Sequence, residues 1–176
     1  FFFKNLIKVN FSKQEERTIY NDFSMICKRL EREPFVLCHR DYHSRNIMLK
    51  NDDCVIIDFQ DARMGLPQYD LVSLLEDAYY DLGDKNRLLL KDYYWDNFLK
   101  KKNIQNRSEF ELLYNLSLLQ RIFKAIGSFS YIYETRKDKR YLKYIGYSFE
   151  KFRHTLMGFK EYKATSVILS KYYYEN

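Results

Sequence analysis

Hydrophobic residues recur every three or four positions over most of this chain, a spacing that places them on one face of a helix. The first such stretch runs from Ile19 to Leu30 and predicts a helix over about residues 12–32. Ser12 and Glu15 have the spacing of a capping box, which marks a helix start. Pro34 ends the helical pattern, because the residue before a proline disfavours helical backbone angles.

A short non-helical region follows this helix. The apolar run from Phe35 to Cys38 predicts a strand. Residues 47–50 and 54–59 flank three polar residues at 51–53, and this arrangement predicts a β-hairpin.

The rest of the chain has helical spacing almost to its end. Asp70 and Asp84 are expected to cap two helices, and Ser108 with Glu111 forms a second capping box. Gly127 is expected to end the helix that starts there, and the basic stretch 136–140 to form a connection. No internal repeat or linker interrupts the pattern, so one compact unit is expected. The predicted helices cover about residues 70–82, 84–101, 108–127, 141–157 and 161–173.

Glycine and proline are scarce, with five and two residues respectively. This scarcity argues against sandwiches and barrels built on many tight turns, and it favours an α+β fold that is mostly helical. The five glycines lie too far apart to form a G-x-G-x-x-G or a P-loop motif.

Composition and charge narrow the choice of partners. Hydrophobic residues make up 46% of the 176, enough to build a core, and the net charge of +6 suits an anionic ligand. The tyrosine-rich tail is expected to pack on neighbouring helices, and the basic clusters lie at helix ends, so no nucleic-acid partner is predicted. No apolar run is long enough to cross a membrane. Three cysteines without a C-x-x-C pair predict reduced, mostly buried thiols in a cytoplasmic protein.

The residues that suggest chemistry lie in the non-helical region. His39-Arg40-Asp41 is followed by Asn46, and Asp58 comes twelve residues after Asn46. This order matches the catalytic loop and metal-binding aspartate of kinase-like phosphotransferases. Asp41 can orient or deprotonate a hydroxyl, and the oxygens of Asn46 and Asp58 are ligands that Mg²⁺ prefers.

Each of these residue types alone is common in turns and helix caps, so the order of the three carries the interpretation. His39 is expected to support the loop through hydrogen bonds rather than to act as the base.

Three stretches are similar to the aminoglycoside phosphotransferase and choline kinase superfamily: Cys38 to Met48, Ile57 to Ala62 and Tyr69 to Leu75. Weaker similarity at Leu119 to Arg121 and beyond extends over most of the chain. Within the superfamily, the chain most resembles bacterial kinases that phosphorylate the anomeric hydroxyl of N-acetylmuramate and N-acetylglucosamine.

The resemblance implies that residues 1–176 form the C-terminal lobe of a kinase-like fold, in which the β-hairpin carries the catalytic and metal-binding loops. It implies that Asp41 is the catalytic base and that Asn46 and Asp58 bind Mg²⁺. It also implies that Asp70 buttresses the catalytic loop and that His43 lies near the transferring phosphate.

Substrate contacts are expected from two further regions, where a basic group would suit the carboxylate that distinguishes N-acetylmuramate. A solvated surface role stays equally open for each of these residues. Gln60 replaces the glycine of D-F-G, so the mobile switch of protein kinases is not expected. The candidates are Arg45, Gln60, Asp61 and Arg63 around the catalytic loop, and Gln120, Arg121 and Lys124 on the helix 108–127.

The predicted function is an ATP-dependent, Mg²⁺-requiring sugar kinase that transfers the γ-phosphoryl group to an amino sugar in cell-wall recycling. Two alternatives stay open: a kinase for another alcohol, such as an aminoglycoside or choline, and a kinase-like binding domain without turnover. The residues before His39 contain no V-A-I-K strand, so the N-terminal nucleotide-binding lobe is expected to be absent and the isolated chain to be inactive.

Overall fold

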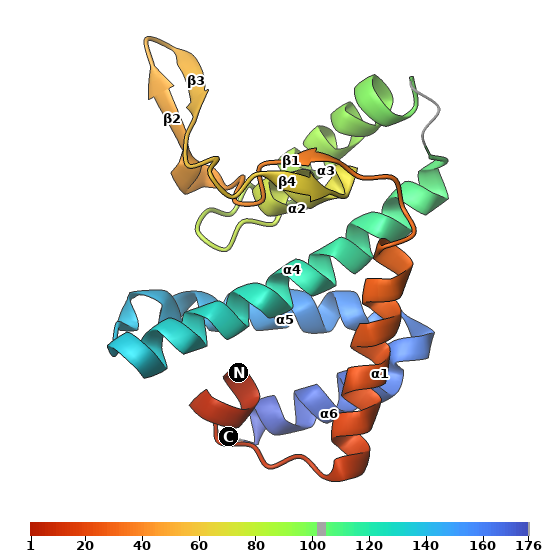
Figure 1. The fold of residues 1–176 in the computed structure, drawn as a ribbon, viewed down its shortest axis with the longest axis vertical. Coiled ribbons are helices and arrows are strands. Elements are labelled where there is room, and N and C mark those ends of the chain that lie inside the picture. The colour runs from red at the N-terminus through yellow and green to blue at the C-terminus, as the bar shows by residue number, and fades with distance from the viewer. Residues whose placement is uncertain (102–104, 176) are drawn as a thin grey trace. The chain divides into compact units, whose positions relative to one another are not determined.

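The computed structural model describes residues 1–101 and 105–175 (Figure 1). It divides into two compact units, where the sequence predicts one: unit 1 comprises Phe1–Glu31 with Leu119–Asn176, and unit 2 comprises Arg32–Leu118. The elements in chain order are the π-helix η1 (Phe2–Leu6), α1 (Lys13–Leu30), β1 (Val36–Cys38), the 3₁₀ turn η2 (Ser44–Asn46), β2 (Ile47–Lys50), β3 (Asp53–Ile56), β4 (Arg63–Gly65), α2 (Pro67–Leu75), α3 (Gly83–Tyr94), the π-helix η3 (Trp95–Leu99), α4 (Arg107–Arg136), η4 (Lys139–Tyr144), α5 (Ile145–Met157), η5 (Lys160–Tyr162) and α6 (Lys163–Tyr174).

The first helix starts at the predicted capping box. The backbone N–H of Glu15 donates to Ser12 Oγ (3.2 Å), and the backbone N–H of Ser12 donates to Glu15 Oε2 (2.8 Å). These two bonds satisfy N–H groups that a helix start leaves without intrahelical acceptors. The prediction of helix 12–32 is therefore confirmed, with α1 running from Lys13 to Leu30.

Unit 1 has an aromatic core. Phe152 of α5 is fully buried, and its ring lies 6.2 Å from that of Phe23 and 5.4 Å from that of Phe123. The ring of Tyr173 stacks on Phe149 at 3.8 Å. The tyrosine-rich tail thus packs on a neighbouring helix, as predicted.

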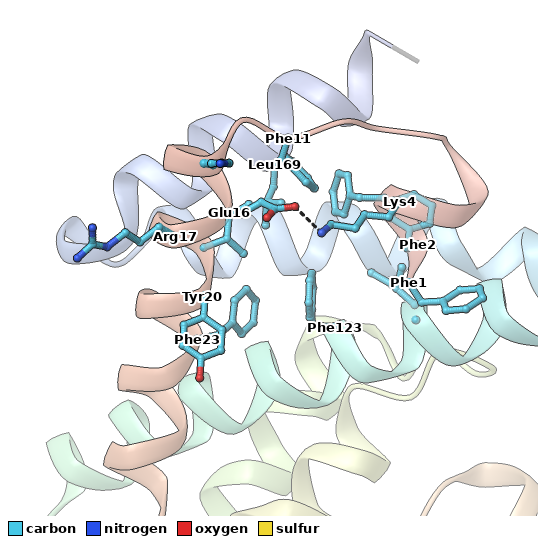
Figure 2. A pocket seen from close by; sticks show the side chains of 15 residues that line it. Phe1, Phe2, Lys4, Phe11, Glu16, Arg17, Tyr20, Phe23, Phe123 and Leu169 are labelled. Carbon is cyan, nitrogen blue, oxygen red and sulfur yellow. Dashed lines mark hydrogen bonds and ion pairs between the residues drawn. The ribbon is translucent and has the colours of Figure 1, made fainter.

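Unit 1 also contains a cavity of about 710 Å³, lined mainly by apolar side chains of η1, α1 and α4. Figure 2 shows the side chains that line this cavity, among them the ion pair between Lys4 and Glu16 and the rings of Phe23 and Phe123. None of the predicted site residues lines this cavity.

Unit 2 contains two separate antiparallel strand pairs. The β2–β3 pairing aligns Ile47 with Ile56 and Lys50 with Asp53, so the predicted hairpin is confirmed, with a turn of two residues rather than three. The second pair joins β1 to β4, with Cys38 opposite Arg63. The sequence predicts β1 but not β4, because three residues with a glycine at one end carry no strand pattern.

Two predicted helix starts are wrong. The helix α2 begins at Pro67, whose fixed φ angle suits the first helical position, so Asp70 lies inside the first turn rather than at the cap. It ends at Leu75, well before the predicted residue 82. The next helix begins at Gly83, which has a φ of +70°, so Asp84 is also inside its helix.

The long helix α4 differs from its prediction at both ends. The side chain of Asn106 accepts a hydrogen bond from the N–H of Glu109 (2.9 Å), so the predicted box at Ser108 and Glu111 does not form. Glu111 pairs instead with Lys91 and Arg107. Gly127 does not end α4, which continues to Arg136, because packing of neighbouring buried residues outweighs the roughly 1 kcal/mol cost of one internal glycine.

The cysteines are all free, but only Cys38 is buried, since Cys27 is half-buried and Cys54 is exposed. The expectation of mostly buried thiols is therefore wrong. Within the described residues, no helix combines the length and the apolar character needed to cross a bilayer.

Candidate active site

The two loops that carry the candidate residues begin next to each other in unit 2. Because β1 and β4 are antiparallel and Cys38 faces Arg63, the end of β1 lies beside the start of β4. The first loop, residues 39–46, follows the end of β1, and the second loop, residues 57–62, precedes the start of β4. The β2–β3 hairpin connects these two loops and projects away from the β1–β4 pair (Figure 1).

The carboxylate of Asp70 holds the start of the first loop. Its Oδ2 accepts a hydrogen bond from the N–H of His39 (2.6 Å), and its Oδ1 accepts one from the N–H of Arg40 (2.9 Å). Arg40 has a φ of +74°, a left-handed conformation that is costly for a residue with a Cβ atom. These contacts are those expected of a residue that buttresses the loop.

The imidazole of His39 links the two loops. Its Nε2 lies 2.9 Å from the carbonyl oxygen of Ile57, the residue before Asp58. The ring lines a cavity of about 450 Å³ together with Tyr42 and Phe59. A hydrogen bond to the backbone fits support of the loops better than proton transfer, in line with the supporting role that we expect for this residue.

The side chain of Asn46 lies between the two candidate acids. Its Nδ2 donates to the backbone oxygen of Asp41 (2.9 Å) and lies 3.5 Å from Oδ2 of Asp58. Asn46 is buried, with 8% of its surface exposed, whereas Asp58 is exposed and has a φ of +67°. The hairpin therefore brings together the three residues that the sequence singles out.

These residues fit a magnesium ion that is shared with a phosphate ligand. Asn46 and Asp58 carry an amide oxygen and a carboxylate, which are hard oxygen ligands, and here the amide nitrogen of Asn46 lies 3.5 Å from Asp58 Oδ2. Among the described residues, no group of three or more histidine, cysteine, aspartate or glutamate side chains is placed to hold a metal. Mg²⁺ commonly takes one or two protein oxygens and fills its other positions with water and substrate phosphates, so a two-residue site suits this ion.

Burial raises the pKa of two groups beside the loop that are already neutral near pH 7. It raises the pKa of the Cys38 thiol to about 11, and the nearby Asp70 carboxylate adds to this effect. Burial also raises the pKa of the Tyr42 hydroxyl.

The other predicted residues of unit 2 lie in or next to the two loops that carry Asp41, Asn46 and Asp58. The side chains of Gln60 and Asp61 are exposed on the segment between Asp58 and β4, and that of Arg63 is exposed at the start of β4. Arg45 is also exposed and follows His43 in the first loop. Their roles toward a substrate stay predictions.

Three predicted substrate residues belong to unit 1. Gln120 is half-buried, and its Nε2 lies 3.6 Å from the sulfur of Cys27. Arg121 is half-buried and Lys124 is exposed on the same helix. Because Gln120, Arg121 and Lys124 belong to unit 1 and the loops to unit 2, their contacts with a substrate stay predictions.

Two residues that contact the first loop were not predicted from the sequence. Oδ2 of Asp77 accepts a hydrogen bond from the N–H of Ser44 (2.8 Å), and the guanidinium of Arg45 lies 3.8 Å above the ring of Tyr79. One signal was available, because Asp77 follows Asp70 by seven residues and so falls on the same side of a helical pattern.

Comparisons with known proteins confirm the resemblance. Residues 16–100 match the model of the phosphotransferase enzyme family. The N-acetylmuramate/N-acetylglucosamine kinase of Neisseria meningitidis serogroup B is 34% identical over 123 residues, covering 64% of this chain and 36% of that protein. The kinase of the same name from Pseudomonas putida is 34% identical over 113 residues, covering 62% of this chain and 33% of that protein. The matched part thus spans about a third of the length of these curated relatives.

Proposed function

Because residues 16–100 of this chain match the phosphotransferase enzyme family, we propose that the complete protein transfers a phosphoryl group from ATP to a hydroxyl group of a small molecule. The acceptor that we propose is an N-acetylated amino sugar. This choice rests on the names of the relatives, which describe kinases of N-acetylmuramate and N-acetylglucosamine.

One observation carries the proposal. The buried amide of Asn46 contacts the backbone of Asp41 and lies 3.5 Å from the carboxylate of Asp58. Phosphoryl transfer depends mainly on positioning and on charge stabilisation, and a loop of this kind fixes both.

Each residue has a definite task in this proposal. Asp41 accepts a hydrogen bond from the attacking hydroxyl, orients it and takes its proton as the new phosphoester bond to the γ-phosphorus forms and the bond between that phosphorus and the β-phosphate oxygen breaks, releasing ADP. Asn46 and Asp58 hold Mg²⁺, which neutralises the phosphate charges when it is bound. His43 is placed in the same loop, two residues after Asp41, where a positive or hydrogen-bonding side chain can face the transferring phosphate.

The preferred acceptor hydroxyl in this proposal is the anomeric one. Gln60 and Arg63 are exposed in unit 2 and can contact sugar hydroxyls or a carboxylate, and Arg45 is exposed while its guanidinium lies over the ring of Tyr79. Cationic acceptors such as aminoglycosides or choline call for an acidic pocket, which the basic residues Arg45 and Arg63 near the proposed site do not favour.

The test is an ATP-consumption assay of the complete protein with N-acetylmuramate, N-acetylglucosamine, an aminoglycoside and choline. We expect turnover with the amino sugars, and a loss of about 10²–10⁴-fold in kcat for Asp41→Ala. The matched control is Asp96→Ala, since Asp96 is exposed on η3 and pairs only with the exposed Lys100 at 3.6 Å among the described residues. Turnover with none of the four acceptors, or full activity of Asp41→Ala, would refute the proposal.

A further inference from the structure

The segment that follows α2 contacts three consecutive residues of the first loop. Asp77 is buried, with 4% of its surface exposed. Its Oδ2 accepts a hydrogen bond from the N–H of Ser44 (2.8 Å), and its Oδ1 accepts one from the N–H of Tyr79 (2.8 Å). One carboxylate therefore ties the end of α2 to the middle of the loop that holds Asp41 and Asn46.

The N–H that bonds to Asp77 belongs to the residue that starts a helical turn. Ser44 is the first residue of η2, the single 3₁₀ turn that ends at Asn46. The residue before this turn, His43, provides no side-chain cap for it. Asp77 fills that role from a distance, because an acidic side chain that accepts an N–H at a turn start replaces a local cap.

The aromatic ring next to Asp77 holds the residues on both sides of Ser44. The ring of Tyr79 meets that of His43 edge to face at 5.2 Å. The same ring also contacts Arg45, whose guanidinium lies 3.8 Å from the centre of the Tyr79 ring, a cation–π distance. The hydrogen bond from the Tyr79 N–H to Asp77 Oδ1 holds the backbone of Tyr79 beside the carboxylate.

We propose that Asp77 is a positioning residue for Asn46. This inference rests on the proposed function, because it assigns Asn46 to the metal-binding end of the loop. Asp77 fixes the start of η2, and the turn carries this constraint over two residues to the Asn46 amide. Loss of the carboxylate leaves the Ser44 N–H without its acceptor and lets the turn move, so that Asn46 no longer faces Asp58.

The geometry distinguishes the carboxylate from its nearest replacement. Asp77 accepts two N–H groups at once, one on each oxygen. An asparagine has one acceptor oxygen and an NH₂ group, which would oppose one of the two N–H donors. Asp77→Asn therefore keeps the side-chain volume and removes one hydrogen bond.

The bond to Ser44, which Asp77→Asn loses or weakens, can be removed completely from its other partner. Ser44→Pro deletes the donor N–H and leaves Asp77 unchanged. Proline is tolerated at the first position of a helical turn, and His43 before it has φ −137° and ψ 168°, which a residue before proline adopts readily. The two variants test one interaction from two sides, and the second keeps the proposal testable if one of them does not fold.

The experiment uses the complete protein and three measurements. Hydrogen–deuterium exchange of peptides that cover residues 42–49 reports on η2, Mn²⁺ binding with ADP is measured by electron paramagnetic resonance, and kcat and KM are measured with the amino sugar. For Asp77→Asn and for Ser44→Pro we expect faster exchange, and a loss of about 10–100-fold in Mn²⁺ affinity or kcat. The sugar KM should change less than about 2-fold.

The matched control is Asp22→Asn in unit 1. Asp22 is a buried carboxylate, with 8% of its surface exposed, and it accepts a hydrogen bond from Thr165 Oγ1 (2.6 Å). Its replacement should lower stability without changing Mn²⁺ binding. The double variant Asp77→Asn/Ser44→Pro should lose no more Mn²⁺ affinity than the worse single variant, because both remove one interaction.

Additive losses in the double variant, or unchanged exchange and Mn²⁺ affinity in folded single variants, would overturn the proposal. Absence of sugar phosphorylation by the unmodified protein would refute the proposed function instead. The exchange and Mn²⁺ measurements would still decide the role of Asp77 in that case.

Discussion

Oδ2 of Asp70 lies 2.6 Å from the backbone nitrogen of His39, 31 residues earlier in the chain. This bond and its partner at Arg40 join the first turn of α2 to the start of the loop that carries Asp41. Without this carboxylate, the N–H groups of His39 and Arg40, which directly follow β1, would lack acceptors in a half-buried region. The carboxylate thus determines where the loop begins.

Asp70→Asn should lower both stability and activity. The asparagine keeps one acceptor oxygen but presents NH₂ to the other N–H, which costs about 1–3 kcal/mol of unfolding free energy. We expect a reduced urea midpoint and a reduced kcat. Asp96→Asn, which changes an exposed carboxylate, serves as the control, and equal midpoints for the two variants would contradict this account.

Arg40→Gly tests the strain in the same loop. Arg40 has a φ of +74°, a conformation that costs a residue with a Cβ atom about 1–3 kcal/mol and glycine almost nothing. We expect the glycine variant to be as stable as the unmodified protein or more stable in urea denaturation. Arg40→Val should be clearly destabilised, because a β-branched side chain is least tolerated there. A glycine variant less stable than the valine variant would show that the Arg40 side chain matters more than its backbone.

Local signals in the sequence predicted the elements that form from neighbouring residues. The capping box at Ser12 and Glu15 is satisfied within four residues, and the hairpin of β2 and β3 closes over a two-residue turn. Both need no information from distant parts of the chain. The sequence predicts them for this reason.

Elements that depend on distant partners were missed or misplaced. The three-residue strand β4 exists because it pairs with β1, about 27 residues earlier. Asp70 does not cap its helix, which Pro67 starts, and the bond from its carboxylate to the loop was indicated by the family resemblance and not by any local pattern. At α4, Asn106 accepts the bond that was assigned to Ser108.

The candidate site shows the same division. Asp41, Asn46 and Asp58 are recognisable by order and spacing, because the loop and hairpin that join them are short. The contact between Asp77 and Ser44 spans 33 residues and connects two segments whose packing no local pattern reveals. The three candidate residues are therefore recognisable from the sequence, whereas the contact between Asp77 and Ser44 is visible only in the structure.

Phe152→Ala should strongly destabilise unit 1. Its side chain is fully buried and packs near the rings of Phe23 and Phe123, so its removal leaves a cavity. We expect a loss of about 3–5 kcal/mol in unfolding free energy, measured by urea denaturation. Val167→Ala is the control, since Val167 is 60% exposed on α6, and its effect should stay within about 0.5 kcal/mol. A small effect of Phe152→Ala would mean that this aromatic core is not tightly packed.

The three cysteines should differ in reactivity. Cys38 is 2% exposed, and its Sγ donates to the carbonyl oxygen of Leu66 at 3.2 Å, whereas Cys54 is exposed on β3. Because the thiolate is the reactive form and burial raises the pKa of Cys38 to about 11, iodoacetamide at pH 8 should alkylate Cys54 much faster than Cys38. Peptide mapping by mass spectrometry at several times measures both rates. Comparable rates in the folded protein would place Cys38 at the surface and contradict the β1–β4 packing.

The raised pKa of Cys38 also predicts how stability changes with pH. The neutral thiol is favoured in the folded protein, so its contribution to stability is complete below pH 9.0, the ordinary thiol pKa, and is lost as the pH rises toward about 11. Cys38→Ala removes this titrating group, and its urea midpoint should therefore fall less steeply between pH 9 and 11 than that of the unmodified protein. Cys54→Ala, which changes an exposed thiol, should keep the steeper slope. Equal slopes for the Cys38→Ala variant and the unmodified protein would show that this thiol ionises as easily in the folded chain as in the unfolded one.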